Sequence, residues 1–157
     1  MRYIFVFLTV AILFFSLCSS ATAQELGAKA LSEIIQEAIP VEFGYVDNTS
    51  YCMHHDLENL SGIDDSYVVV CAEATNFNEF GVFHCQSSTD TKHCVKQLNE
   101  FLEKRKTQFR SGVIYDINEY PKFENAKVIS FGQYVIYVIL DAPQSDKAIR
   151  AVKAALS

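Results

Sequence analysis

The chain has 157 residues, 50% of them hydrophobic, and a formal net charge of −6. That length fits one domain with a single hydrophobic core. An acidic chain is poorly suited to nucleic acid, because neutralising phosphates requires clustered Lys and Arg. The one basic run, KRKTQFR at 104–110, falls at the end of a predicted helix, where cations complement the helix dipole. We therefore expect no nucleic-acid partner.

The N-terminal segment has the pattern of a secretory signal peptide. Arg2 precedes an almost unbroken apolar run over residues 3–18. The sequence ATA at 21–23 then supplies the small residues that a signal peptidase requires. Cleavage is expected before Gln24.

Two alternatives keep this segment attached to the domain. As an uncleaved membrane anchor, the apolar run is slightly shorter than the roughly 20 residues of a span. As a lipoprotein signal with Cys18 lipidated, it has Leu17 where the peptidase requires a small side chain. We predict a signal peptide over 1–23, a single domain over 24–157, and an extracytoplasmic protein, secreted or associated with the cell surface. A membrane contact is expected only through an uncleaved or lipidated N-terminus.

The first half of the domain begins with a helix. Apolar residues recur on one stripe over 24–39, and Pro40 ends the pattern. A short strand is predicted at 41–46. Two runs rich in β-branched and aromatic residues, 66–73 and 79–85, flank the turn-prone TNFN and predict a hairpin.

The second half repeats this order. A helix is predicted over 89–110, with Thr89 or Ser88 as its N-cap and a stop at Gly112. A second hairpin follows over 126–140, with a two-residue turn at Gly132-Gln133 that needs a positive φ at the glycine. A last helix covers 142–156. The predicted fold is α+β: an N-terminal helix, then two hairpin-helix units forming a four-stranded antiparallel sheet covered by helices on one face.

The cysteines of the predicted mature chain are Cys52, Cys71, Cys85 and Cys94. Export and an even count favour two disulfides, for which three pairings are possible. We prefer Cys85–Cys94 with Cys52–Cys71, because Cys94 lies on the core side of its helix and a short connection joins it to Cys85. The alternative is that some are free, buried cysteines that act as small hydrophobic residues.

Metal binding has one candidate segment, CMHHD at 52–56, whose possible ligands are Cys52, His54, His55 and Asp56. A hydrolytic zinc site needs three well-spaced ligands and an open position, and two of these histidines are adjacent. His84 or His93 brought near by folding would strengthen the case. The paired carboxylates Asp64-Asp65 are interpreted as the cap of a turn. We predict no cofactor.

A long connection between the second helix and the second hairpin contains Tyr115, Tyr120 and Phe123. Long loops with exposed aromatic residues often form contact surfaces, so we take this loop as the candidate binding surface. The alternative is that these rings fold back over the sheet edge.

Residues 57–156 resemble a known family. The resemblance rests on Tyr120-Pro121, Asn125-Ala126 and the turn Gly132…Tyr134-Val135. The family is domain of unknown function 4358. The resemblance implies a small exported protein or lipoprotein of Gram-positive bacteria, with no established activity. Our chain departs from the family in its poorly formed lipobox at Cys18 and in its cysteines.

The expected function is therefore a non-catalytic binding or interaction module at the cell surface, with a protein partner there. An enzyme is the less favoured class. The alternative is a metal-binding protein or metal-dependent enzyme that uses the Cys52–Asp56 loop.

Overall fold

The computed structural model describes residues 26–39, 57, 60–71, 75–113 and 117–157. The predicted signal peptide, the strand predicted at 41–46 and the loop at 52–56 lie outside these residues.

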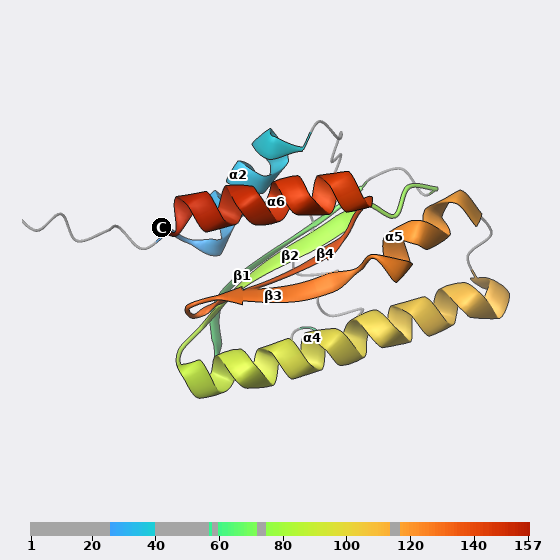
Figure 1. The fold of residues 1–157 in the computed structure, drawn as a ribbon. Coiled ribbons are helices and arrows are strands. Elements are labelled where there is room, and N and C mark those ends of the chain that lie inside the picture. The colour runs from blue at the N-terminus through green and yellow to red at the C-terminus, as the bar shows by residue number, and fades with distance from the viewer. Residues whose placement is uncertain (1–25, 40–56, 58–59, 72–74, 114–116) are drawn as a thin grey trace, which may run out of the picture.

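A four-stranded antiparallel sheet organises the fold (Figure 1). Its strands follow the order β1-β2-β4-β3. The bounds are β1 Ile63–Val70, β2 Glu79–Cys85, β3 Lys127–Phe131 and β4 Tyr134–Ile139. Both predicted hairpins are confirmed, as is the α+β class, and Gly132 has the expected positive φ of 58°.

The described α-helices are α2 Ala28–Ala38, α4 Ser88–Gln108, α5 Tyr120–Glu124 and α6 Ala142–Ala155, with a π-helix at Phe109–Val113 and a 3₁₀ turn at Ile117–Glu119. The ends of α2, α4 and α6 lie within four residues of their predicted positions, whereas α5 falls in the connection predicted as a loop. The cap of α4 is Ser87, in place of the predicted Ser88 or Thr89, and its hydroxyl accepts from the Asp90 amide at 3.2 Å. The predicted stop at Gly112 is wrong, because the π-helix continues through it.

The prediction that helices cover one face of the sheet is wrong. In Figure 1, α4 lies on one face, and α2 and α6 lie together on the other. The reason is β4, whose six residues are all buried. Successive side chains of a strand point to opposite faces, so a strand that is apolar throughout needs cover on both.

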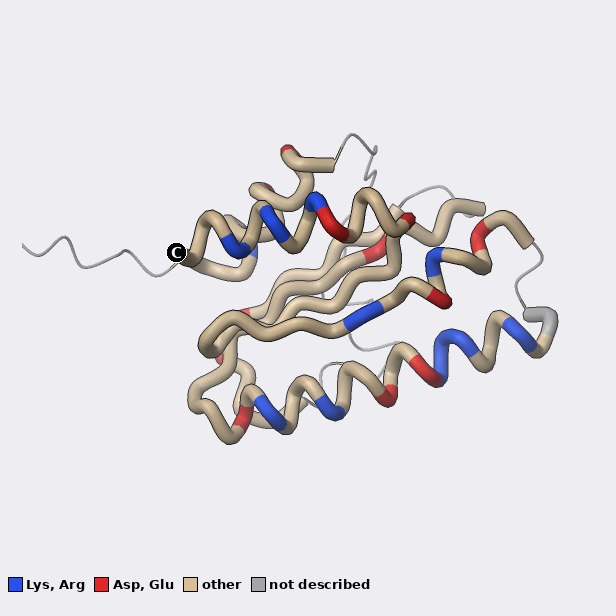
Figure 2. The backbone as a smooth tube through the Cα atoms, in the orientation of Figure 1, with Lys and Arg blue, Asp and Glu red and all other residues tan. Residues whose placement is uncertain are grey.

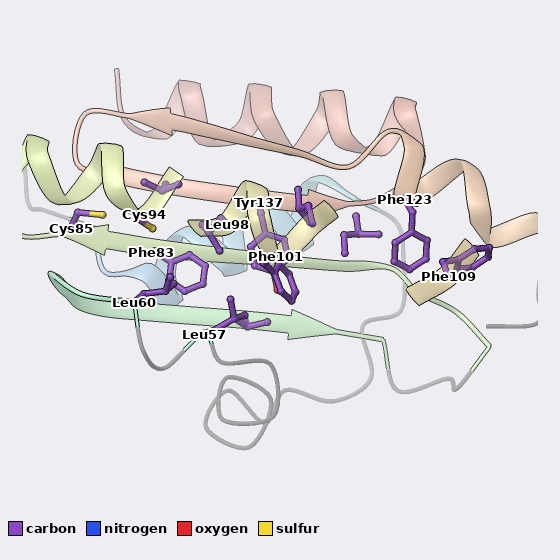
Figure 3. Packing of buried hydrophobic residues seen from close by; sticks show 14 residues of the cluster. Leu57, Leu60, Phe83, Cys85, Cys94, Leu98, Phe101, Phe109, Phe123 and Tyr137 are labelled. Atoms are coloured by element: carbon purple, nitrogen blue, oxygen red, sulfur yellow. The ribbon is translucent and has the colours of Figure 1, made fainter. Parts of the chain in front are cut away.

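The two faces bury different side chains. The α4 face holds a cluster rich in aromatic residues, including Phe83, Phe101, Phe123 and Tyr137 (Figure 3). The α2/α6 face is mainly aliphatic, with Leu31, Ile35, Val82 and Ile136 among its members. No helix among the described residues is long and apolar enough to cross a bilayer.

A glycine in β2 makes room for the largest ring of the α4 face. Gly81 lies directly opposite Tyr137. A Cβ on Gly81 would lie 2.4 Å from Tyr137 Cε1 and 2.9 Å from Phe83 Cε2. The missing side chain therefore lets the Tyr137 ring lie across the strand.

Candidate functional site: the His84 cleft

Two adjoining hollows open at the end of the sheet where the β3–β4 turn lies, and His84 and Tyr134 line both. The larger, of about 400 Å³, is called here the basic hollow because it contains Lys153. The smaller, of about 300 Å³, is called the acidic hollow because it contains Asp64 and Asp65. Together they form the His84 cleft.

The alternation of β2 points His84 toward this cleft. Phe83 and Cys85 belong to the cluster under α4, so His84 between them faces α2 and α6. Its cross-strand neighbour is Tyr134, and the two ring centroids are 4.6 Å apart. The side chain of His84 is only 13% exposed, so its ring forms part of the floor between the hollows.

An irregularity in β1 brings a carboxylate to His84. Ile63 pairs with Cys85 and Asp65 pairs with His84, so Asp64 is an extra residue on β1. Such a bulge re-aims a side chain and is frequent beside functional sites. Asp64 Oδ1 lies 2.7 Å from His84 Nδ1, which fixes the orientation of the imidazole ring.

Two further hydrogen bonds tie the N-terminus of α2 to the sheet. Asp65 Oδ2 accepts from the Ala28 amide at 2.6 Å, and the Tyr134 hydroxyl donates to the Leu26 carbonyl at 2.6 Å. The interpretation of Asp64-Asp65 as a turn cap is therefore wrong. Both lie in β1, and Asp65 caps a helix that precedes it by 37 residues.

The basic hollow is walled by the turn and by the end of α6. Phe131 and Leu156 supply apolar surface, and Gln133 and Lys153 supply polar groups. The cleft thus combines an oriented imidazole, carboxylates on one side, an ammonium group on the other and an apolar wall. Such a set of groups suits recognition of a small polar ligand.

The described residues contain no cluster of three His, Cys, Asp or Glu side chains that could hold a metal ion. Cys52, His54, His55 and Asp56 lie outside them. The structure does not bring His93 to His84. His93 is an exposed residue of α4, on the opposite face of the sheet, where its Nδ1 lies 3.5 Å from the Ser61 hydroxyl.

The structure places Cys85 and Cys94 side by side in the core under α4 (Figure 3), both fully buried. They are free thiols that share a hydrogen bond, so no bridge joins them in this structure. Burial raises the pKa of both thiols. Cys71 is partly buried, and Cys52 lies outside the described residues.

The predicted aromatic contact loop is wrong for the residues that can be placed. Phe123 is fully buried, so it cannot meet a partner. Tyr120 is partly buried and packs on Phe109, and its hydroxyl accepts from Arg110 Nε at 2.9 Å. Both rings instead pack against Phe109, at the end of α4. Tyr115 lies outside the described residues.

Sequence reasoning did not assemble the cleft, because Asp64, His84, Tyr134 and Lys153 come from separate strands and a helix. A signal was present at two points. His84 follows the apolar run of residues 80–83 in β2, and two adjacent aspartates follow Ile63 at the start of β1. Adjacent strand residues normally face opposite sides, and only the bulge lets both serve the same cleft.

The comparisons with known proteins identify a family and no activity. The family model described as a domain of unknown function, DUF4358, matches residues 55–140. Neither a curated protein nor a solved structure matches the chain.

Proposed function

We propose that this chain, which belongs to the DUF4358 family, is an exported, non-catalytic module that binds a small ligand in the His84 cleft. Export is supported by the signal-like pattern of residues 1–23. It places the module outside the cytoplasm, at the cell surface or in the surrounding medium.

The observation that carries the binding role is the preformed architecture of the cleft. The Asp64–His84 contact and the hydrogen bonds from Ala28 to Asp65 and from Tyr134 to Leu26 hold its polar groups in place. Groups fixed before binding lose little conformational freedom when a ligand arrives. The basic hollow also has the volume of a small-molecule site, for which about 300–1,000 Å³ is usual.

Export also leads us to propose that Cys85 and Cys94 become joined by a disulfide in an oxidising compartment. Their contact in the core supports this pairing. The mass of the exported protein, alkylated under denaturing conditions without reductant, tests it. A linked peptide pair containing both cysteines is expected, whereas alkylation of both would overturn the proposal.

A small-molecule screen tests the binding role. Titration of ¹⁵N-labelled domain with small polar metabolites should give at least one compound that shifts the amide signals of His84, Gln133 and Tyr134. Lys153→Trp, which fills the basic hollow, should abolish those shifts. Lys147→Trp, on the same helix outside the cleft, should preserve them. Hits that perturb only other surfaces, or no hits, would overturn the proposal, and turnover of a hit would identify an enzyme instead.

A further inference from the structure

The two sides of the His84 cleft carry opposite charges. The acidic hollow contains Asp64 and Asp65 on β1, and the basic hollow contains Lys153 on α6. His84 and Tyr134 line both hollows, so a ligand that extends over these two rings meets both signs.

Asp64 can accept hydrogen bonds beyond the one it makes with His84. An ionised carboxylate offers about four acceptor positions on two oxygens. The contact with His84 uses Oδ1, and the side chain is 44% exposed. Asp65 is committed to capping α2. Asp64 is therefore the carboxylate that a ligand cation would meet.

In the basic hollow, the ammonium group of Lys153 can meet a ligand anion. Among the described residues, no carboxylate lies within 4.0 Å of its Nζ, unlike Lys127, which pairs with Asp146 at 3.3 Å. Phe131 and Leu156 border the same hollow with apolar surface. A ligand anion can therefore meet Lys153 while an attached apolar group packs on these two side chains.

This arrangement distinguishes between classes of ligand. A purely anionic ligand would face repulsion from two carboxylates on β1, and a purely cationic one would face Lys153. A molecule with both charges gains from each side, and the aromatic floor of His84 and Tyr134 can contact the part between them.

We propose that the His84 cleft binds zwitterions, namely amino acids or short peptides with free termini and an apolar side chain. The amine meets Asp64 and the carboxylate meets Lys153. This inference rests on the proposed binding function.

Calorimetric titration with leucine, dileucine and trileucine tests this proposal. At least one should bind. Acetylation of its amine and amidation of its carboxylate should each weaken binding at least tenfold. In Lys153→Gln the free acid and the amide should bind alike, and in Asp64→Asn the amine and its acetylated form should bind alike. Lys147→Gln is the matched control and should behave as the unmodified chain, with thermal melting confirming that each variant is folded.

The zwitterion proposal would be overturned if peptides with blocked and free termini bound equally to the unmodified chain. It would also be overturned if Lys153→Gln and Asp64→Asn still distinguished blocked from free termini as well as the unmodified chain does. If these probes fail but another small molecule shifts the signals of His84 and Tyr134, only the ligand class is wrong. If nothing perturbs the cleft, the binding function itself fails.

Discussion

The two ends of the sheet use charged residues in different ways. We call the end of the sheet at the β1–β2 connection the closed end. There the Glu119 carboxylate accepts hydrogen bonds from the Phe77 amide at 2.8 Å and from Lys122 Nζ at 2.6 Å. Lys122 also donates to Asn76 Oδ1 at 3.2 Å and is only 5% exposed. These charges are paired with one another and with the backbone.

Glu79 repeats this pattern inside the core of the closed end. It is 3% exposed, accepts from the Tyr137 hydroxyl at 2.7 Å and pairs with Arg105 at 3.2 Å. We call the opposite end of the sheet, at the β3–β4 turn, the open end. There, by contrast, Asp64 and Lys153 border hollows on either side of His84. Figure 2 shows charged residues of both signs along α4, whereas along α6 one acidic residue is followed by basic ones. Charge at the closed end is thus paired within the fold, whereas charge in the cleft lines the site that we propose binds a ligand.

Removal of the Glu79 carboxylate should give the largest loss of unfolding free energy. Glu79→Ala leaves Arg105 and the Tyr137 hydroxyl without their carboxylate partner. Breaking a buried pair in this way costs about 3–5 kcal/mol of unfolding free energy. Urea unfolding measures it, with exposed Glu100→Ala on α4 as the control that stays within about 0.5 kcal/mol. A loss no larger than the control's would mean that the closed end is not held by its charges.

Substitution of Gly81 should give the next largest loss of unfolding free energy, because it disturbs the packing of the Tyr137 ring. Gly81→Ala places a methyl group against the Tyr137 ring and should cost about 1–3 kcal/mol. Gly132 is the comparison, because a Cβ there meets nothing within 4 Å and only its positive φ opposes a side chain. Gly132→Ala should therefore cost about 1 kcal/mol, the lower end of the cost of a left-handed conformation for a residue with a Cβ. Thermal melting ranks the two, and the reverse order would contradict the packing of Tyr137 across Gly81.

At the open end, Tyr134→Phe should have a smaller effect. It removes the hydrogen bond to the Leu26 carbonyl, which contributes about 0.5–1.5 kcal/mol. Because this bond ties the start of α2 to the sheet, amide exchange should quicken in α2 more than in α4. Uniform quickening across the domain would show instead that α2 does not open separately.

The sequence predicts both hairpins and the α6 helix, because β-branched and aromatic runs and turn residues are local signals. The Gly132 turn is an example, since a two-residue hairpin turn demands a positive φ there. The bounds of β1 are the exception, since this strand lies three residues before the predicted 66–73. The second covered face also had a signal, namely β4, whose apolar run has no polar side.

The cleft was beyond local reasoning for a different reason. Asp64 reaches His84 only because β1 carries an extra residue opposite Cys85 and His84, and a bulge leaves no sequence signature of its own. Lys153 joins them only through the packing of α6 on the sheet. The exposure of Tyr120 and Phe123 was misjudged because a long connection does not reveal which of its rings the core will accept.

The last prediction concerns the thiols under α4, near the open end. Burial raises the pKa of Cys94 and of Cys85 above the ordinary value of 9.0. Thiols whose pKa is higher in the folded than in the unfolded chain contribute stability that is fully present below the unfolded pKa of 9.0. This contribution is lost as the pH rises from that value through the folded-state pKa. The urea midpoint of the reduced protein should therefore fall above pH 9, and Cys71→Ser should leave this fall unchanged.

The same measurement on the oxidised protein tests whether the two thiols cause this loss of stability. A Cys85–Cys94 bridge has no thiol proton to lose, so this part of the alkaline decline should disappear after oxidation and return on reduction. An identical decline in both forms would assign it to other groups and argue against the bridge. The chemistry of the two cysteines can thus be read from stability alone, independently of any ligand in the His84 cleft.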